Sequence, residues 1–306
     1  MTSSSMSSGP VVVVTGANGL VGSRIVAALS ERQATVLAVV RCAGTAPVLP
    51  GVFERVGDFA DPAFADAVVA GTDALITTVH PLGGDASSQR TVGLQGTLVI
   101  ANAAATAGVP MMVHVSTAAV YDRAPGVGDV DEDAALVPDD AGDYSVIKRD
   151  LDAALAEIRG MTRVLLRPPA ILGAGDSSVW NSRVPAQLRD DESARHAVPE
   201  ETFAWVHVDD LAAVAADVSV GAIATSDDPE TAPVANQCTV VNVASGRATQ
   251  RDYYGAVTRA LGVEPVWEDK PAWTGQIRAD RARRWGWQPK VDLADALSEL
   301  EVGLRS

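Results

Sequence analysis

The chain has 306 residues and 47% of them are hydrophobic, which is enough apolar material for one large α/β domain or for one domain with an additional lobe. Its net charge of −15 argues against sequence-independent binding to nucleic acid or to anionic membranes. The two cysteines, Cys42 and Cys238, lie far apart without CxxC spacing, and no apolar run is long enough to cross a bilayer, so we expect a cytoplasmic protein without a disulfide framework or a metal site.

Residues 1–10 are rich in serine and lack the apolar segment of a signal peptide, so we expect a disordered tail. From Val11 onward, strand-like runs alternate with helical patterns, which is typical of βαβ units in a parallel sheet covered by helices on both faces. The expected strands are 11–15, 35–40, 52–56, 73–79, 111–116 and 163–167, and the expected helices are 19–31, 61–70, 86–107 and 141–159. This alternation predicts an α/β fold with a doubly wound parallel sheet of the Rossmann type.

The alternation loosens after Arg167, and residues 173–204 show no long periodic element. Further elements are expected at 209–219, 238–243, 249–261 and 291–301. We expect this part to form a smaller C-terminal lobe over the carboxyl edge of the sheet, where ligands bind in open α/β folds. We interpret residues 222–237 as a surface excursion, and a group of arginines as a solvated helix face: Arg278, Arg281, Arg283 and Arg284.

A glycine-rich run, TGANGLVG at 15–22, lies between the first strand and the first helix. Its spacing is GxxGxxG, a variant of the GxGxxG dinucleotide-binding pattern. In such a turn, backbone N–H groups and the positive end of the helix dipole point at a pyrophosphate, and the glycines let it approach. The predicted phosphate-binding positions are Gly16, Asn18, Gly19, Leu20, Val21 and Gly22.

The second strand ends in Arg41, at the place where an NAD-binding fold usually carries an acidic residue. A guanidinium there neutralises and binds a 2′-phosphate, so NADP(H) is favoured over NAD as the cofactor, and Arg24 can add to the same positive patch. The third strand ends in Asp58 and Phe59, and a carboxylate at this point can accept a hydrogen bond from the adenine amino group.

Tyr144 and Lys148 are four residues apart in a predicted helix, so their side chains share one face. A neighbouring ammonium stabilises a phenolate and lowers the tyrosine pKa, which makes proton transfer to a reacting oxygen feasible near neutral pH. The buried strand before this helix ends in Ser116 and Thr117. We predict that Thr117 polarises a substrate oxygen and that Ser116 lies close to a nicotinamide.

With these motifs in order, the chain resembles the extended short-chain dehydrogenases/reductases, a superfamily that includes NAD(P)-dependent epimerases and dehydratases. The resemblance covers nearly the whole chain and rests on six motifs: TGANGLVG at 15–22, GD at 57–58, VSTAAVY at 115–121, YSVIK at 144–148, RPPAILGAGD at 167–176 and WVHVDDLA at 205–212.

The resemblance implies a seven-stranded Rossmann sheet with a C-terminal substrate-binding lobe. It also implies a catalytic triad of Thr117, Tyr144 and Lys148, with Lys148 holding the nicotinamide ribose. The nicotinamide would be bordered by the segment that contains Pro168, Ala170 and Ile171. We therefore divide the chain into an NADP-binding domain at 11–172 and a substrate-binding lobe at 173–306, of which segments within about 205–245 return to the sheet. A homodimer through the helices at 86–107 and 141–159 is also expected.

The chain departs from the family pattern at two places. The family asparagine in the helix after the fourth strand is replaced by Gly93, and Asn102 is a candidate for its new position. The fourth strand usually ends in a Leu-Ala-Ala-like sequence, but here it continues into His80 and Pro81. The His80 side chain is thus expected near the cofactor, where it either contacts the ribose or fills space.

The expected substrate class follows from the resemblance to this superfamily. Sugar-nucleotide enzymes commonly carry an asparagine where this chain has Ala170, and dehydratases need a carboxylate pair where it has Ala118 and Ala119. The chain is closest in motif to NADPH ketoreductases and 3β-hydroxysteroid dehydrogenase-like enzymes, which predicts hydride transfer to a ketone, or from a secondary alcohol, of a small lipophilic metabolite. The alternatives are a nucleotide-sugar epimerase or ketoreductase and a non-catalytic NADP-sensing regulator. Candidate substrate contacts are Pro81, Trp180, His196 and Trp205.

A metal site is considered at His207, Asp209 and Asp210, because histidine and carboxylates are common metal ligands. The family pattern favours another interpretation, in which His207 ends a strand and Asp209 caps the next helix. No metal is therefore expected at these residues.

Overall fold

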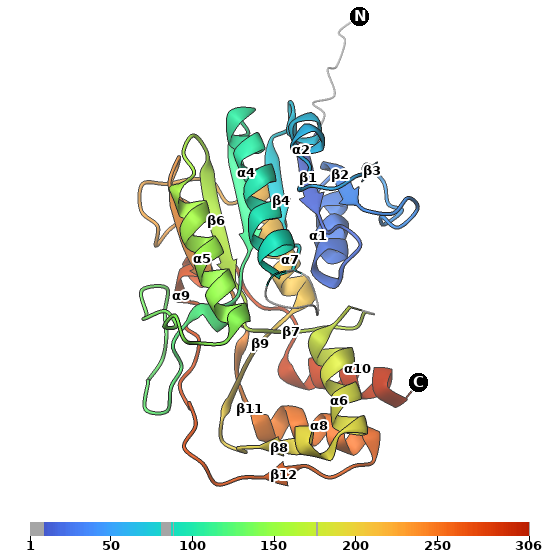
Figure 1. The fold of residues 1–306 in the computed structure, drawn as a ribbon, viewed down its shortest axis with the longest axis vertical. Helices are drawn as coiled ribbons and strands as arrows, with labels where there is room; N and C mark the ends of the chain where they lie inside the picture. Colours follow the sequence, from blue (N-terminus) through green and yellow to red (C-terminus); the bar gives the residue numbers. More distant parts are fainter. Residues whose placement is uncertain (1–8, 81–86, 88, 176, 306) are drawn as a thin grey trace, which may run out of the picture.

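A seven-stranded sheet forms the centre of the molecule in the computed structural model, which describes residues 9–80, 87, 89–175 and 177–305 (Figure 1). All its strands are parallel, in the order β10-β6-β5-β4-β1-β2-β3. Their bounds are Val11–Thr15 (β1), Thr35–Val40 (β2), Val52–Val56 (β3), Ala74–Thr77 (β4), Met111–Val115 (β5), Thr162–Arg167 (β6) and Cys238–Asn242 (β10). The predicted α/β class and Rossmann sheet are confirmed.

Helices cover both faces of this sheet, because successive strand residues point to opposite sides. Val12 and Val14 of β1 pack in one apolar cluster with α1 (Leu20–Glu31) and α7 (Val208–Ser219). Val13 packs in the other cluster, beneath the second layer of helices: α2 (Pro62–Val69), α4 (Thr97–Thr106) and α5 (Asp143–Glu157). In the described part of the chain, no helix combines the length and hydrophobicity needed to span a membrane.

The helix expected at 86–107 is not a continuous α-helix. Gln89–Gly96 is a π-helix (η1), and the regular helix α4 begins only at Thr97. Two buried glycines lie in the π-helical part, and a Cβ at Gly96 would lie 3.0 Å from the Phe59 ring. Close packing here requires small residues, and wide π-turns of this kind occur frequently at functional sites.

The C-terminal lobe has its own small sheets. β9 (Thr202–His207) pairs with β7 (Ala170–Leu172) in parallel and with β11 (Gly246–Thr249) in antiparallel orientation. β8 (His196–Ala197) pairs with β12 (Val266–Trp267) at the end of the lobe far from the central sheet (Figure 1). Its helices are α6 (Val184–Asp190), α8 (Gln250–Leu261) and α10 (Leu293–Arg305).

The expectation of no long element within 173–204 was wrong. A π-helix (η3, Val179–Arg183) runs directly into α6, and β9 begins at Thr202. The change from π to α winding breaks the 3.6-residue periodicity by which helices are recognised in a sequence. The apolar side of this segment packs against α8 and α10, so tertiary contacts stabilise what the local pattern does not indicate.

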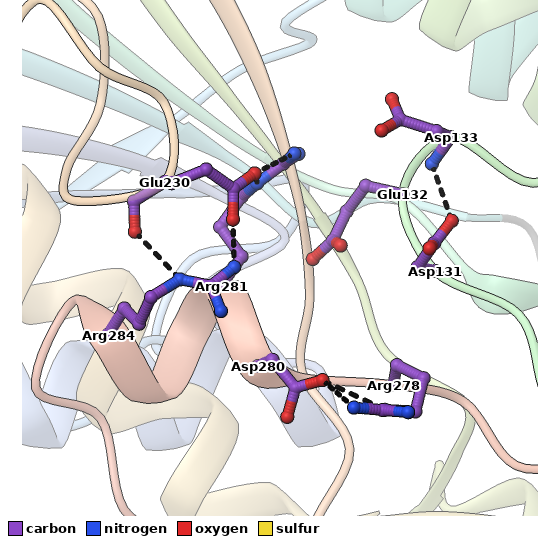
Figure 2. A pocket seen from close by; sticks show the side chains of 8 residues that line it. All are labelled: Asp131, Glu132, Asp133, Glu230, Arg278, Asp280, Arg281 and Arg284. Atoms are coloured by element: carbon purple, nitrogen blue, oxygen red, sulfur yellow. Dashed lines mark hydrogen bonds and ion pairs between the residues drawn. The ribbon is translucent and has the colours of Figure 1, made fainter.

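The expected solvated face of arginines around α9 (Asp280–Arg284) holds for Arg278 and Arg284, which are exposed, but not for Arg281. Arg281 is buried; its Nε donates to Glu230 Oε1 at 2.9 Å and its Nη1 donates to the Val240 carbonyl of β10. Arg284 also pairs with Glu230, so the predicted surface excursion at 222–237 is tied to the sheet. Figure 2 shows these side chains converging. The adjoining cavity of about 240 Å³ is lined by Asp131, Glu132, Asp133, Glu230, Arg278, Asp280, Arg281 and Arg284.

Candidate active site

The glycine turn between β1 and α1 has the backbone of a phosphate cradle. Gly16 has a φ of 67°, and a Cβ there would lie 2.8 Å from Thr78 Oγ1. A Cβ at Gly22 would lie 2.0 Å from the Gly16 carbonyl oxygen, so only glycine lets the helix pack against the turn. The first turn of α1 carries neither a side-chain cap nor an acidic residue. Its positive end is therefore free of intrinsic negative charge, which fits a pyrophosphate.

A residue of the lobe reaches this cradle. The backbone N–H of Leu20, the first residue of α1, donates to Ser177 Oγ at 2.9 Å. A Cβ at Gly175 would lie 2.8 Å from the Leu20 side chain. The segment that follows β7 thus lies against the glycine turn.

The ends of β2 and β3 carry the residues that were predicted to bind the adenosine part of the cofactor. Arg41 is exposed, and within the described part of the chain its guanidinium takes part in no ion pair. Asn18 Nδ2 donates to Thr45 Oγ1 at 3.3 Å, which joins the glycine turn to the loop after Arg41. Asp58 is exposed and accepts from the Ala60 N–H at 2.9 Å, whereas Phe59 is buried in the core.

Thr117, Tyr144 and Lys148 meet at the carboxyl edge of the sheet. Thr117 follows β5, and its Oγ1 accepts from the Ala119 N–H at 3.1 Å. Its side chain also interacts with Tyr144, which lies in the first turn of α5, and lowers the pKa of that tyrosine. Lys148, one turn further along α5, is 3% exposed and donates from Nζ to the Val115 carbonyl at 3.3 Å.

The pKa values of this pair differ from the sequence-based expectation. Burial raises the pKa of Tyr144, and the hydrogen bond with Thr117 opposes this rise only in part. Burial lowers the pKa of Lys148 to about 8, against the attraction of Asp152. The expected lowering of the tyrosine pKa does not hold: burial and the Asp152 charge raise the pKa of Tyr144, and the Lys148 ammonium is directed to the Val115 carbonyl.

His80 packs against the catalytic candidate Tyr144. Their rings meet edge to face, with centroids 4.7 Å apart and planes at 70°. Burial and, secondly, the Lys148 ammonium lower the pKa of His80 to about 4. The imidazole is therefore neutral at physiological pH. Its contact with a ribose stays a prediction, and Pro81 lies outside the described residues.

The remaining predicted cofactor contacts lie at the same edge. Ser116 is buried at the end of β5. The Pro168 carbonyl accepts from the Ala118 N–H at 2.8 Å, and Ala170 and Ile171 belong to β7. Gly93 is buried within η1, whereas Asn102 is exposed and donates to the Leu98 carbonyl of its own helix, so the structure brings no asparagine from Asn102 to the site.

The substrate candidates of the lobe occupy different environments. Trp180 packs edge-on against Phe203 and Tyr253, at 5.1 and 5.5 Å between ring centroids. Trp205 is 3% exposed in the same apolar cluster. His196 lies on β8 at the far end of the lobe, where it contacts Glu268 at 3.0 Å, so the fold does not bring it to the edge where Tyr144 lies (Figure 1). The substrate roles of Trp180, Trp205 and His196 stay predictions.

His207, Asp209 and Asp210 have structural partners. The ring of His207 accepts at Nδ1 from the Asp209 N–H and contacts Glu299 of α10 at 3.1 Å through Nε2. His207 is therefore the cap of α7, and the expectation that Asp209 caps this helix was wrong. The Asp210 carboxylate accepts from two backbone N–H groups that precede α10.

Three buried polar residues near the site were not singled out from the sequence. Asp152 accepts from Arg167 Nε at 2.9 Å, and both side chains are buried. His114 is fully buried on β5, where its Nδ1 contacts Thr77 Oγ1 at 2.7 Å. A signal for Asp152 was available, because it lies four residues after Lys148 and so shares its helix face.

The family model described as NAD dependent epimerase/dehydratase family matches residues 12–220. The Bordetella bronchiseptica enzyme WbmG, solved with NAD, is 18% identical with a TM-score of 0.73, over 98% of this chain and 95% of that chain. UDP-glucose 4-epimerase of Thermotoga maritima, solved with UDP-glucose, is 17% identical with a TM-score of 0.73, over 96% and 98%. The Thermus thermophilus UDP-glucose 4-epimerase, solved with NAD, is 21% identical with a TM-score of 0.71, over 97% and 99%. None of the curated proteins matches the sequence.

Proposed function

Because the chain belongs to the NAD dependent epimerase/dehydratase family, within the extended short-chain dehydrogenases/reductases, we propose that it is an NADP(H)-dependent oxidoreductase. Its reaction would transfer a hydride between the nicotinamide and a ketone or secondary alcohol of a small lipophilic metabolite. One observation carries the proposal: the Thr117 side chain interacts with Tyr144 at the carboxyl edge of the sheet, and Lys148 lies buried one helical turn away.

Different residues bind different parts of the cofactor. The glycine turn and the start of α1 hold the pyrophosphate, Arg41 holds the 2′-phosphate, and Lys148 holds the nicotinamide ribose. When bound, the nicotinamide supplies or takes the hydride, and the protein contributes positioning and charge.

Protein side chains carry out the chemistry at the substrate oxygen. In the direction of reduction, Thr117 and Tyr144 donate hydrogen bonds to the carbonyl oxygen, and Tyr144 gives up its proton to that oxygen. The Lys148 ammonium stabilises the resulting phenolate, which lowers the barrier to proton transfer. The neutral His80 ring packs on Tyr144 and limits its rotation. In the direction of oxidation the same groups act in reverse.

Arg41 supports NADP(H) rather than NAD. The guanidinium is exposed at the end of β2, without a carboxylate partner in the described part of the chain. A free cation at this point attracts a phosphate. The structural neighbours solved with NAD are 18–21% identical, a level that speaks for their fold and not for the cofactor of this chain.

The first test follows NADPH oxidation by absorbance with a panel of lipophilic ketones and nucleotide-diphospho-ketosugars, beside the same panel with NADH. We expect turnover of a lipophilic ketone with a clear preference for NADPH. Turnover of the nucleotide sugars alone would show an epimerase-like substrate site in spite of Ala170. Tight NADPH binding with no turnover across the panel would favour a non-catalytic sensor.

A matched pair of variants tests the cofactor assignment. Arg41→Ala should weaken NADPH binding by about 10- to 100-fold, the loss expected for charge-assisted hydrogen bonds, and should leave NADH binding unchanged. Arg55→Ala removes an exposed arginine from the neighbouring strand β3 and serves as the control. Equal effects of the two variants on NADPH binding would contradict a specific role for Arg41.

A further inference from the structure

A buried carboxylate lies one helical turn beyond Lys148. Asp152 and Lys148 are each 3% exposed and lie four residues apart on the inner face of α5. The carboxylate is bonded to Arg167 Nε of β6 at 2.9 Å, so its described ion pair is with Arg167 and not with Lys148. Its attraction reaches the Lys148 ammonium through space, in surroundings where little water screens it.

Arg167 fixes this carboxylate from the opposite side. Its Nη1 donates to the Tyr121 hydroxyl at 3.0 Å, and its guanidinium carbon lies 5.0 Å from the centre of the Tyr121 ring. The Tyr121 hydroxyl in turn donates to Asn242 Oδ1 of β10 at 2.8 Å. The Asp152 carboxylate is thus held by a chain of contacts that spans α5, β6 and β10, and it has little freedom to move.

The other groups around Lys148 do not supply a negative charge. Burial lowers the pKa of His80 and of His114, so both imidazoles are neutral, and each contributes nothing to hold an ammonium. Burial raises the pKa of Tyr144, which is therefore a neutral phenol. Among the described groups, Asp152 is the one that raises the pKa of Lys148. The titratable groups that face Lys148 are Tyr144 and Asp152 of α5, His114 of β5, and His80 after β4.

We propose that Asp152 is a positioning residue of the hydride-transfer site: held by Arg167, its carboxylate keeps the buried Lys148 ammonium charged beside Tyr144. This inference rests on the proposed function for its consequence in catalysis. Asp152 makes no described hydrogen bond to Thr117 or Tyr144, and we assign its effect on catalysis to Lys148, although its charge also raises the pKa of Tyr144 directly. Without this charge, the lysine would lose its proton at lower pH, and Tyr144 would lose the cation that stabilises its phenolate.

The charge of Lys148 can be measured directly, because the sequence contains three lysines: Lys148, Lys270 and Lys290. In protein labelled with ¹³C at lysine Cε, three NMR signals are expected. The signal that is absent from the spectrum of the Lys148→Arg variant belongs to Lys148. We expect the titration midpoint of this signal to fall by about one pH unit in Asp152→Asn. Asp152→Glu keeps the charge and should restore the midpoint, while Lys270 and Lys290 serve as internal references.

Asp150→Asn is the matched control, because Asp150 lies on the same helix but is partly exposed and pairs with Arg149. In Asp150→Asn, the titration midpoint of the Lys148 signal should equal that of the wild-type protein. Should Asp152→Asn unfold because Arg167 is left unpaired, the double variant Asp152→Asn, Arg167→Met removes both charges and should show a smaller fall, because the loss of the Arg167 cation favours the charged lysine in part. An unchanged midpoint in the folded single or double variant would overturn the proposal.

The pH profile of kcat/KM with NADPH and a ketone gives the second measurement. The alkaline limb should move down with the NMR midpoint in Asp152→Asn and return in Asp152→Glu. A uniform fall of kcat/KM at all pH values, with no movement of the limb, would indicate a purely structural role and overturn the proposal. A wild-type protein without turnover would contradict the proposed function alone, because the NMR titration needs no turnover.

Discussion

Tyr144 is the residue on which the proposed chemistry depends, and three side chains determine its properties. The Thr117 side chain interacts with Tyr144, His80 packs edge-on against its ring, and Lys148 lies on the same helix face. The i, i+4 spacing made the pairing with Lys148 predictable from the sequence. The contact with His80 was not predictable, because it depends on how the chain leaves β4.

Removal of the Tyr144 hydroxyl should abolish most of the activity. We expect Tyr144→Phe to lower kcat by about 10²- to 10⁴-fold, the range of general acid–base catalysis, because the aliphatic hydroxyl of Thr117 is a weaker acid than a phenol. NADPH binding should be unchanged. Tyr254→Phe, in helix α8 of the lobe, is the control. Steady-state kinetics and fluorescence titration with NADPH measure both effects, and a fall of less than tenfold would contradict the role.

The pH dependence should follow Lys148. Its pKa of about 8 means that the ammonium is charged below this pH and is lost as the pH rises through it. The value of kcat/KM for reduction should therefore fall above about pH 8. His80, with a pKa of about 4, should contribute no limb near pH 6.5. A rate that stays level up to pH 10, or a His-like limb near neutrality, would be inconsistent with these environments.

At the scale of elements, long buried strands could be predicted from the sequence, whereas short strands could not. The buried strands such as β5 and β6 were predicted within one or two residues, because a strand covered on both faces reads as a continuous apolar run. β7, β8 and β11 were missed, because two to four residues carry no period. The π-helix η1 was assigned as part of an α-helix, because it runs directly into α4, whose regular helical pattern was extended over it.

The joint between β1 and α1 should depend on Gly22. A Cβ at Gly22 would lie 2.0 Å from the Gly16 carbonyl oxygen, so we expect Gly22→Ala to lower the free energy of unfolding by about 1–3 kcal/mol and to abolish cofactor binding. Gly255→Ala is the control. It lies in helix α8 with no atom within 4 Å of an added Cβ, and it should raise the free energy of unfolding by about 0.5–1 kcal/mol. Urea unfolding compares them, and equal effects would contradict the close approach.

At the scale of the whole molecule, the C-terminal region is tied back to the central sheet. Trp287 Nε1 donates to the Asp210 carbonyl, and the Asp210 carboxylate accepts from the backbone N–H groups of Lys290 and Val291. Glu299 of α10 accepts from the Ala174 N–H and contacts His207. These contacts hold the lobe over the edge of the sheet where the candidate site lies (Figure 1).

Loss of the Asp210 carboxylate should loosen this connection. We expect Asp210→Ala to lower the free energy of unfolding by about 1–3 kcal/mol, because two part-buried backbone N–H groups lose their acceptor. The exposed neighbour Asp209 contacts Arg24 at 3.6 Å, and Asp209→Ala should cost less than about 1 kcal/mol. Urea unfolding of the two variants gives the comparison. A smaller loss for Asp210 than for Asp209 would show that the C-terminal segment is held by other contacts.

We propose further that two copies of the chain associate through α4 and α5. Their sequences are rich in alanine, and small side chains allow helices of two subunits to approach closely. Sedimentation equilibrium should therefore give about twice the chain mass of 31.7 kDa. A mass of one chain over the micromolar range would exclude this assembly.

The sequence by itself determined the central sheet, the glycine turn and the spacing of Tyr144 and Lys148, because each of these depends on residues close together in the chain. Tertiary structure alone decided that Asp152 meets Arg167, that His80 packs on Tyr144 and that Arg281 is buried with Glu230. It also reversed the expected direction of the Tyr144 pKa. The physical reason is the same in each case: burial and long-range pairing set the energy of a charge, and neither can be read from local sequence.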